Sequence, residues 1–201
     1  MRGFRTLLLV GLMVLAMAGM ALAAAAATPK TAVEAQVQKV ISTLAEPAFK
    51  DQSRENKIEK IRTIINEIFD YTELSRRTLG RDWAKFKPEQ QQEFVKLFSD
   101  LLEKTYADRL LAYSNEKVVF DKENVLSEGR AEVFSNVLTT DGKKIPLDYR
   151  LISKEGKWLV YDVIIEGISM VRNYRDQFRD ILAKNPPEHV LKVLRERAQE
   201  G

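Results

Sequence analysis

The sequence has no cysteine and only one histidine, and both absences limit its chemistry. Without cysteine there is no disulfide, no thiolate metal site and no cysteine nucleophile. His189 is the single histidine, so catalytic or metal sites that need several imidazoles are excluded as well. We therefore expect no metal, no cofactor and no catalytic residues.

Motifs for nucleotide binding and acyl transfer are also missing. The nine glycines are scattered, so no phosphate-binding loop can be recognised, and no G-x-S-x-G motif occurs. Ser169 follows an apolar run but has no histidine nearby, so helix N-cap is its expected role. Asp162 and Glu166 stand four residues apart on a strand, about 13 Å, which exceeds the roughly 5–9.5 Å of glycosidase carboxylate pairs.

Neither sign of charge dominates the chain. The net charge is +3 over 201 residues, and Arg2 and Arg5 supply two of these charges in a segment that we expect to be removed. The remainder is too small for a nucleic-acid footprint. Hydrophobic residues make up 45% and charged residues 30%, which is an ordinary globular composition for one domain with a real core.

The first 27 residues are typical of an export signal. Arg2 and Arg5 precede an apolar run that starts at Leu7, and Ala21-Leu22-Ala23 is a small-residue cleavage site. The run is also long enough to span a bilayer, so a retained anchor is the alternative interpretation. Several overlapping alanine sites favour cleavage, which predicts an exported protein, periplasmic in a bacterium with two membranes.

An apolar strand organises the rest of the chain. Residues 157–165 are apolar at nearly every position, which predicts a strand covered on both faces. Simple alternation divides the run into two faces, Trp158, Val160 and Ile164 on one and Leu159, Tyr161, Val163 and Ile165 on the other. We expect the strand to turn at Gly167 directly into a helix. Asp162 is the one acid in the run, so it needs a hydrogen bond or a charge partner.

The remaining patterns predict helices, then strands, then helices. Helical spacing marks residues 33–44, 53–71, 72–79 and 87–113, and the last of these carries a wide stripe rich in aromatics. Core packing is the ordinary interpretation of such a stripe, although it can also wall a cavity. Alternation with Gly turns predicts a four-stranded antiparallel meander of strands 117–126, 130–140, 144–153 and 157–165. Helices 168–183 and 188–197 follow.

This order indicates an α+β fold with helices packed on one face of a curved antiparallel sheet. Residues 1–23 are the expected signal peptide and residues 24–201 the expected single domain. Within that domain we expect a helical part over 31–113, a sheet over 117–165 and C-terminal helices over 168–198.

Residues 156–170, GKWLVYDVIIEGISM, closely resemble the pattern G-x-W-x-x-Y-D-x-x-x-E-G-[VI]-S-[ML] of the MlaC (toluene-tolerance) family. Three other passages are similar to that family, DYTELSRRTLG at 70–80 followed by Trp83, PEQQQEF at 88–94 and KTYA at 104–107. The resemblance is specific over about residues 70–183 and looser elsewhere.

The resemblance implies a function that composition alone does not. The family's members are periplasmic phospholipid carriers, with a sheet of nuclear-transport-factor-2-like type and a helical layer that encloses an apolar cavity. It implies a phospholipid with buried acyl tails, shuttled between outer and inner membranes to maintain outer-membrane lipid asymmetry. The implied partners are an outer-membrane lipoprotein–porin complex and an inner-membrane ABC transporter with an MCE-type subunit, and no nucleic acid.

Apolar residues of the wide helical stripe, the third and fourth strands and the last turn form the candidate lipid-binding set. Tyr106 and Ile168 match family motif positions. The set is Phe94, Phe98, Leu101, Leu102, Tyr106, Leu147, Tyr149, Val163, Ile165, Ile168 and Val171. No Arg/Lys cluster interrupts these stripes, so no deep phosphate site is expected and the headgroup is expected to stay in water.

A local basic cluster lies outside these stripes, at Arg76, Arg77 and Arg81. Its ordinary interpretation is a solvated surface, and its alternative is a docking patch for anionic headgroups or a partner. Two other function classes stay open. One is an isomerase-type enzyme of nuclear-transport-factor-2-like fold that works from Asp162 and Tyr161, and the other is a ligand-free adaptor that binds only proteins.

Overall fold

The computed structural model describes residues 27–113 and 116–199, so the expected signal peptide lies outside the described residues. The helices are α1 (Pro29–Ala45), α2 (Pro47–Lys50), α3 (Arg54–Asn66), α4 (Tyr71–Leu79), the 3-10 helix η1 (Gly80–Lys85), α5 (Pro88–Leu111), α6 (Met170–Leu182) and α7 (Pro187–Gln199). The strands are β1 (Lys117–Ser127), β2 (Arg130–Leu138), β3 (Lys144–Lys154), β4 (Lys157–Ile165) and β5 (Ile168–Ser169). None of the helices described is long and apolar enough to cross a bilayer.

The predicted α+β class and antiparallel meander are confirmed, with one strand more than expected. The sheet order is β1-β2-β3-β4-β5, and every neighbouring pair is antiparallel. Glu166 and Gly167 have φ values of 50° and 82°, so two successive left-handed residues reverse the chain as in a tight hairpin. Ile168 therefore pairs with Ile165, and the helix expected from residue 168 begins only at Met170.

A β-bulge in β4 overturns the simple alternation expected for this strand. Leu151 of β3 pairs with Val160, whereas the preceding Arg150 pairs with Asp162, so Tyr161 is an extra residue. One extra residue exchanges the faces of everything beyond it. Val163 consequently packs in the same cluster as Val160, although alternation had placed the two on opposite faces.

The helix expected over residues 53–71 is shorter in the structure, whereas the separate helix expected over 72–79 is present as α4. The shorter helix, α3, ends at Asn66, and the chain then runs beside β4 in a single parallel bridge at Phe69. The Val160 N–H donates to the Ile68 carbonyl at 2.7 Å, and the Asp70 N–H donates to the Val160 carbonyl at 2.9 Å. The Asp70 side chain then caps α4 by accepting from the Glu73 N–H at 2.9 Å, which fixes the start of a separate helix.

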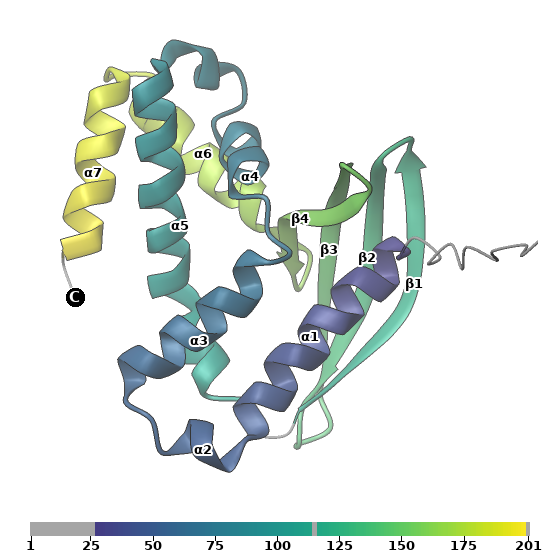
Figure 1. Ribbon diagram of the computed structural model, residues 1–201. Coiled ribbons are helices and arrows are strands. Elements are labelled where there is room, and N and C mark those ends of the chain that lie inside the picture. Colours follow the sequence, from purple (N-terminus) through teal and green to yellow (C-terminus); the bar gives the residue numbers. More distant parts are fainter. Residues whose placement is uncertain (1–26, 114–115, 200–201) are drawn as a thin grey trace, which may run out of the picture.

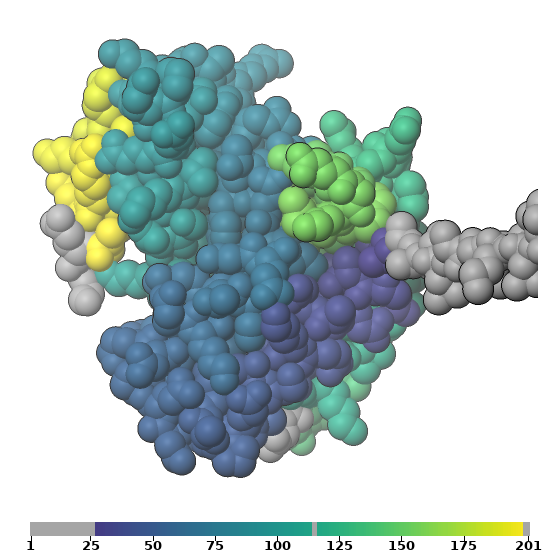
Figure 2. All heavy atoms as spheres, in the orientation of Figure 1, coloured from purple at the N-terminus to yellow at the C-terminus, as the bar shows by residue number. Residues whose placement is uncertain are grey.

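Figure 1 shows α1 lying along one face of the sheet, with α4 to α7 gathered beyond the β4 edge. Figure 2 shows the same division from outside, with α5 and α7 on one side and α1 with the strands on the other. Apolar packing follows this division. The helical core, built from α4 to α7, includes Phe94 and Phe98, and the sheet core packs Val33 of α1 against Leu151 and its neighbours. A smaller cluster joins the ends of α1 to α3 around Phe49.

Candidate functional site at the junction of two cores

The aromatic stripe of α5 forms the centre of the helical core. Phe94 and Phe98 are fully buried, and their rings lie 5.4 Å apart between centroids. Phe178 of α6 meets Phe94 edge-on at 5.3 Å, and Tyr174 meets Phe98 edge-on at 5.0 Å. Each such pair contributes about 0.5–1.5 kcal/mol beyond its buried area. Leu101, Leu102 and Val171 of the predicted set also lie in this core, and Tyr106 packs partly buried against it.

The strand members of the predicted set lie in the sheet core instead. Tyr149 and Val163 are buried there, and Leu147 and Ile165 pack partly buried against them. The Tyr149 ring stacks on Phe120 at 6.4 Å between centroids. Burial raises the pKa of Tyr149 well above its ordinary value of 10.0, so its hydroxyl stays neutral at physiological pH.

Two residues join the cores, and we call the region around them the junction. Phe69 and Met170 each pack partly buried against both the helical core and the sheet core. Phe69 stacks on Tyr71 at 5.6 Å between centroids. Burial, with the Glu103 carboxylate as a further cause, raises the pKa of Tyr71 to about 12. Sequence reasoning missed both joining residues, although Met170 occupies the last position of the family pattern.

The predicted set is thus brought together in two groups rather than one. Tyr106, Leu147 and Ile165 are the members that stay only partly buried beside the cores. Ile168 belongs to neither core, because it lies on β5 with 66% of its surface exposed. Its place on β5 follows from the hairpin at Gly167, which sequence periodicity had interpreted as the start of the helix. The lipid-binding role of the set stays a prediction.

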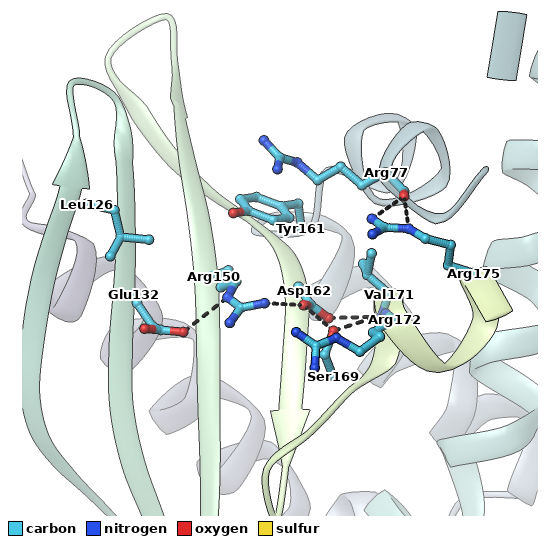
Figure 3. Close-up of a pocket in the computed structure, with 10 residues that line it drawn as sticks. All are labelled: Arg77, Leu126, Glu132, Arg150, Tyr161, Asp162, Ser169, Val171, Arg172 and Arg175. Atoms are coloured by element: carbon cyan, nitrogen blue, oxygen red, sulfur yellow. Dashed lines mark hydrogen bonds and ion pairs between the residues drawn. The ribbon is translucent and has the colours of Figure 1, made fainter. Parts of the chain in front are cut away.

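Asp162 ties β4 to the start of α6. Its Oδ2 accepts from the Ser169 hydroxyl at 2.6 Å and from Arg150 at 3.4 Å, and its Oδ1 accepts from the Val171 N–H at 3.0 Å. Ser169 in turn accepts from the Arg172 N–H at 3.1 Å as the N-cap of α6. The predictions that Asp162 is partnered and that Ser169 is an N-cap are therefore both confirmed. Figure 3 shows this arrangement.

The predicted basic cluster is partly neutralised and partly built into the fold. Glu73 is buried and accepts from Arg76 at 2.9 and 2.8 Å and from Arg77 at 2.7 Å. Burial acts to raise the pKa of Glu73, but these hydrogen bonds outweigh it and hold that pKa below 4.5. The Arg77 guanidinium lies over the Tyr161 ring, 3.9 Å from its centroid. Arg81 is exposed in η1.

Two surface pockets lie outside the residues that join the cores. One, of about 380 Å³, is lined by residues from α4, β3, β4 and α6, among them Arg77, Tyr161 and Val171. The other, of about 430 Å³, lies at the far ends of α1 and α5 and has Leu44 and Phe49 in its lining. No group of three metal-ligating side chains gathers within residues 27–113 and 116–199.

These features define an α+β protein in which a curved antiparallel sheet and a helical bundle meet at an apolar junction. A family model described as MlaC protein matches residues 34–196, and the chain belongs to the MlaC family. The resemblance first seen in residues 156–170 is thereby confirmed.

Relatives and a solved structure extend this result. The chain is 30% identical over 179 residues to the toluene tolerance protein Ttg2D of Pseudomonas putida, covering 87% of this chain and 82% of that protein. It is 28% identical over 169 residues to the intermembrane phospholipid transport system binding protein MlaC of Haemophilus influenzae, covering 78% and 79%. A phospholipid-binding protein from Ralstonia solanacearum, solved in complex with a phospholipid, is 27% identical with a TM-score of 0.78, covering 86% of this chain and 97% of that one.

Proposed function

We propose that this protein is a periplasmic phospholipid carrier that holds acyl tails at the junction between its helical and sheet cores. One observation carries the proposal. The chain shares its fold over 86% of its length with a protein whose structure contains a bound phospholipid. The names of its relatives, which include an intermembrane phospholipid transport system binding protein, support the same ligand class.

Physical chemistry explains why such a carrier needs a divided apolar interior. A tail of about sixteen carbons costs roughly 12 kcal/mol to expose to water, at about 0.8 kcal/mol for each CH₂ group. A site for it must be dry when occupied and closed when empty. A tail that enters between the two cores beside Phe69 and Met170 would leave the closely packed rings of Phe94 and Phe98 in place.

The junction also suggests which predicted residues contact a tail first. Tyr106 packs partly buried against the helical core, and Leu147 and Ile165 pack partly buried against the sheet core, so all three can cover a ligand without leaving the protein interior. The fully buried members of the predicted set would form the layer behind them. We place the headgroup at the surface, because the tails supply most of the transfer free energy.

The enzyme alternative finds no support at the residues on which it depends. Both oxygens of Asp162 accept hydrogen bonds from groups that build the fold, and the Arg77 guanidinium covers the Tyr161 ring. A general base needs a free oxygen within reach of a substrate proton. We therefore propose a carrier without catalytic groups.

The partners that we propose follow from the family resemblance. They are an outer-membrane lipoprotein–porin complex and an inner-membrane ABC transporter with an MCE-type subunit. Lipid exchange between them would maintain outer-membrane lipid asymmetry. Pull-down of the purified protein with each complex, in detergent, tests this part separately from lipid binding.

The carrier is tested by organic extraction of the purified mature protein followed by mass spectrometry. The wild-type protein is expected to yield phospholipid in stoichiometric amounts. Met170→Glu is expected to lower the yield at least about tenfold, because a carboxylate at the junction would be desolvated by the tails. The matched control is Val125→Glu, since Val125 is 67% exposed on β1. A wild-type protein without lipid, or a folded Met170→Glu protein with full lipid content, would overturn the proposal.

A further inference from the structure

The pocket of about 380 Å³ lies on the face of the sheet opposite α1 and is lined by four arginines. Arg77 comes from α4, Arg150 from β3, and Arg172 and Arg175 from α6. We call it the arginine pocket. Its volume lies within the roughly 300–1,000 Å³ range of small-molecule sites. It was not expected from the sequence, since its arginines come from three separate segments.

The charges around the arginine pocket do not cancel. Arg150 is neutralised by Glu132 at 3.0 Å and by Asp162 at 3.4 Å. Arg77 shares the Glu73 carboxylate with its neighbour Arg76. No carboxylate forms an ion pair with Arg172 or Arg175 in the described part of the chain, so two guanidinium charges at the pocket remain available.

Two of the guanidinium groups are held in place before any ligand arrives. Arg175 donates two hydrogen bonds to the Arg77 carbonyl oxygen, at 3.0 and 2.6 Å. The Arg77 guanidinium is stacked on Tyr161 and is bound to Glu73. Donors that are already fixed lose little conformational entropy on binding. A planar guanidinium also presents paired N–H groups that match phosphate oxygens.

The pocket has apolar surface beside its charges. Tyr161 and Val171 form part of its lining, and Leu126 stands at its rim with 54% of its surface exposed. An inorganic phosphate ion has no apolar surface to bury against these side chains, whereas the carbon skeleton of an organic phosphate would cover them. Val171 also follows Met170 directly in the sequence, so one residue that lines the arginine pocket is the chain neighbour of a junction residue.

From this geometry we infer that the arginine pocket is a binding site for a phosphate-class anion. The anion is either the phosphodiester of a phospholipid headgroup, in which case the inference rests on the proposed function, or a free organic phosphate. Arg172 and Arg175 supply the uncompensated charge, and Arg77, which Tyr161 and Glu73 hold in place, supplies a further guanidinium group. This site revises the expectation that the headgroup meets only water.

Titration of tail-free probes into the mature, ¹⁵N-labelled protein tests the site itself. Inorganic phosphate and sn-glycerol 3-phosphate are both expected to shift the backbone amide signals of Arg172 and Arg175. Glycerol 3-phosphate is expected to bind more tightly, because its carbons cover the apolar wall. Arg172→Gln with Arg175→Gln is expected to weaken binding at least about tenfold, since each charge-assisted hydrogen bond contributes roughly 1.5–3 kcal/mol, or about tenfold or more.

Two further proteins keep this test decisive. Arg172→Gln alone serves if the double variant fails to fold, because the Arg172 side chain makes no hydrogen bond or ion pair within the described residues. Arg179→Gln is the matched control, since Arg179 lies on α6 outside the pocket, with 63% of its side chain exposed and with Asp176 as its partner at 3.2 Å. This control is expected to bind both probes as the wild type does.

Lipid analysis of the same variants separates the two sources of phosphate. If the anion is a headgroup, the double variant loses phosphatidylglycerol relative to phosphatidylethanolamine while its total lipid stays unchanged. If the anion is a free organic phosphate, both probes bind and the lipid composition does not change. Absence of binding up to about 10 mM, or equal binding by the double variant, overturns the inference. A protein that carries no lipid overturns only the proposed function, because the titration still decides the pocket.

Discussion

Removal of the Asp162 carboxylate tests how β4 is fastened to α6. Asp162→Ala would leave the buried Val171 N–H without its acceptor at 3.0 Å, which costs about 1–3 kcal/mol. It would also remove the 2.6 Å bond from the Ser169 hydroxyl, for about another 1 kcal/mol. Arg150 adds little, because its side chain is 35% exposed and keeps Glu132 as a partner. The expected loss in the free energy of unfolding is therefore about 2–4 kcal/mol.

Asp162→Asn should lose less, about 1–3 kcal/mol, because its amide oxygen can still accept from the Val171 N–H. The assay is urea unfolding followed by far-UV circular dichroism, with an unchanged m-value as the check on two-state behaviour. Asp176→Ala is the control, since Asp176 is an exposed carboxylate on α6, and it should change stability by less than about 0.5 kcal/mol. If Asp162→Ala were as stable as this control, the hydrogen bonds would not fasten the strand. Asp162→Asn should also retain lipid.

Three further outcomes are expected. N-terminal sequencing of the exported protein should return a start between Ala24 and Thr28, and an intact signal segment would contradict the cleavage. Because the pKa of Glu73 is lowered in the folded state, its contribution to stability is present above pH 4.5 and is lost as pH falls through the lowered value. Glu73→Gln should accordingly reduce the loss in the free energy of unfolding as pH falls below 4.5. An unchanged dependence on pH in this range would refute this. Glu166→Asn should raise stability by about 0.5–1 kcal/mol in thermal unfolding, because asparagine tolerates the left-handed φ of 50° better than glutamate does; a lower melting temperature would count against it.

Strands and hairpins were predictable because their signals are local. Alternation and the Asp141-Gly142 and Glu155-Gly156 turns are enough to place β2, β3 and β4 within two residues of their observed ends. The bulge at Tyr161 was not predictable, because it depends on Arg150 of the neighbouring strand pairing with Asp162. The early end of the predicted 53–71 helix at Asn66 was missed for the same reason, since a backbone bridge to β4 outweighs an unbroken apolar stripe.

The candidate site also depends on tertiary contacts that local sequence patterns do not reveal. Helical and strand periodicity correctly marked Phe98 and Tyr149 as buried, but periodicity cannot say that they belong to different cores. Met170 was overlooked because the turn at Gly167 had been interpreted as the first turn of a helix, which placed Ile168 inward instead. The Arg172 and Arg175 side chains have the spacing of an ordinary solvated helix face, and only tertiary structure brings Arg77 beside them.

The helical core is assembled from segments that are far apart in the chain, and this has a consequence for the order of folding. The β1–β4 hairpins join neighbours in sequence and can form early, whereas α4 packs on α6 and α5 packs on α7 across about a hundred residues. Val190 and Leu194 of α7 are fully buried in that core. On a nascent chain, the rings of Phe94 and Phe98 therefore lack Tyr174 and Phe178 until α6 has been synthesised, and the helical core stays incomplete until α7 follows. A chain delayed in this way remains unfolded longer and keeps apolar surface exposed, a state in which chaperones are most needed.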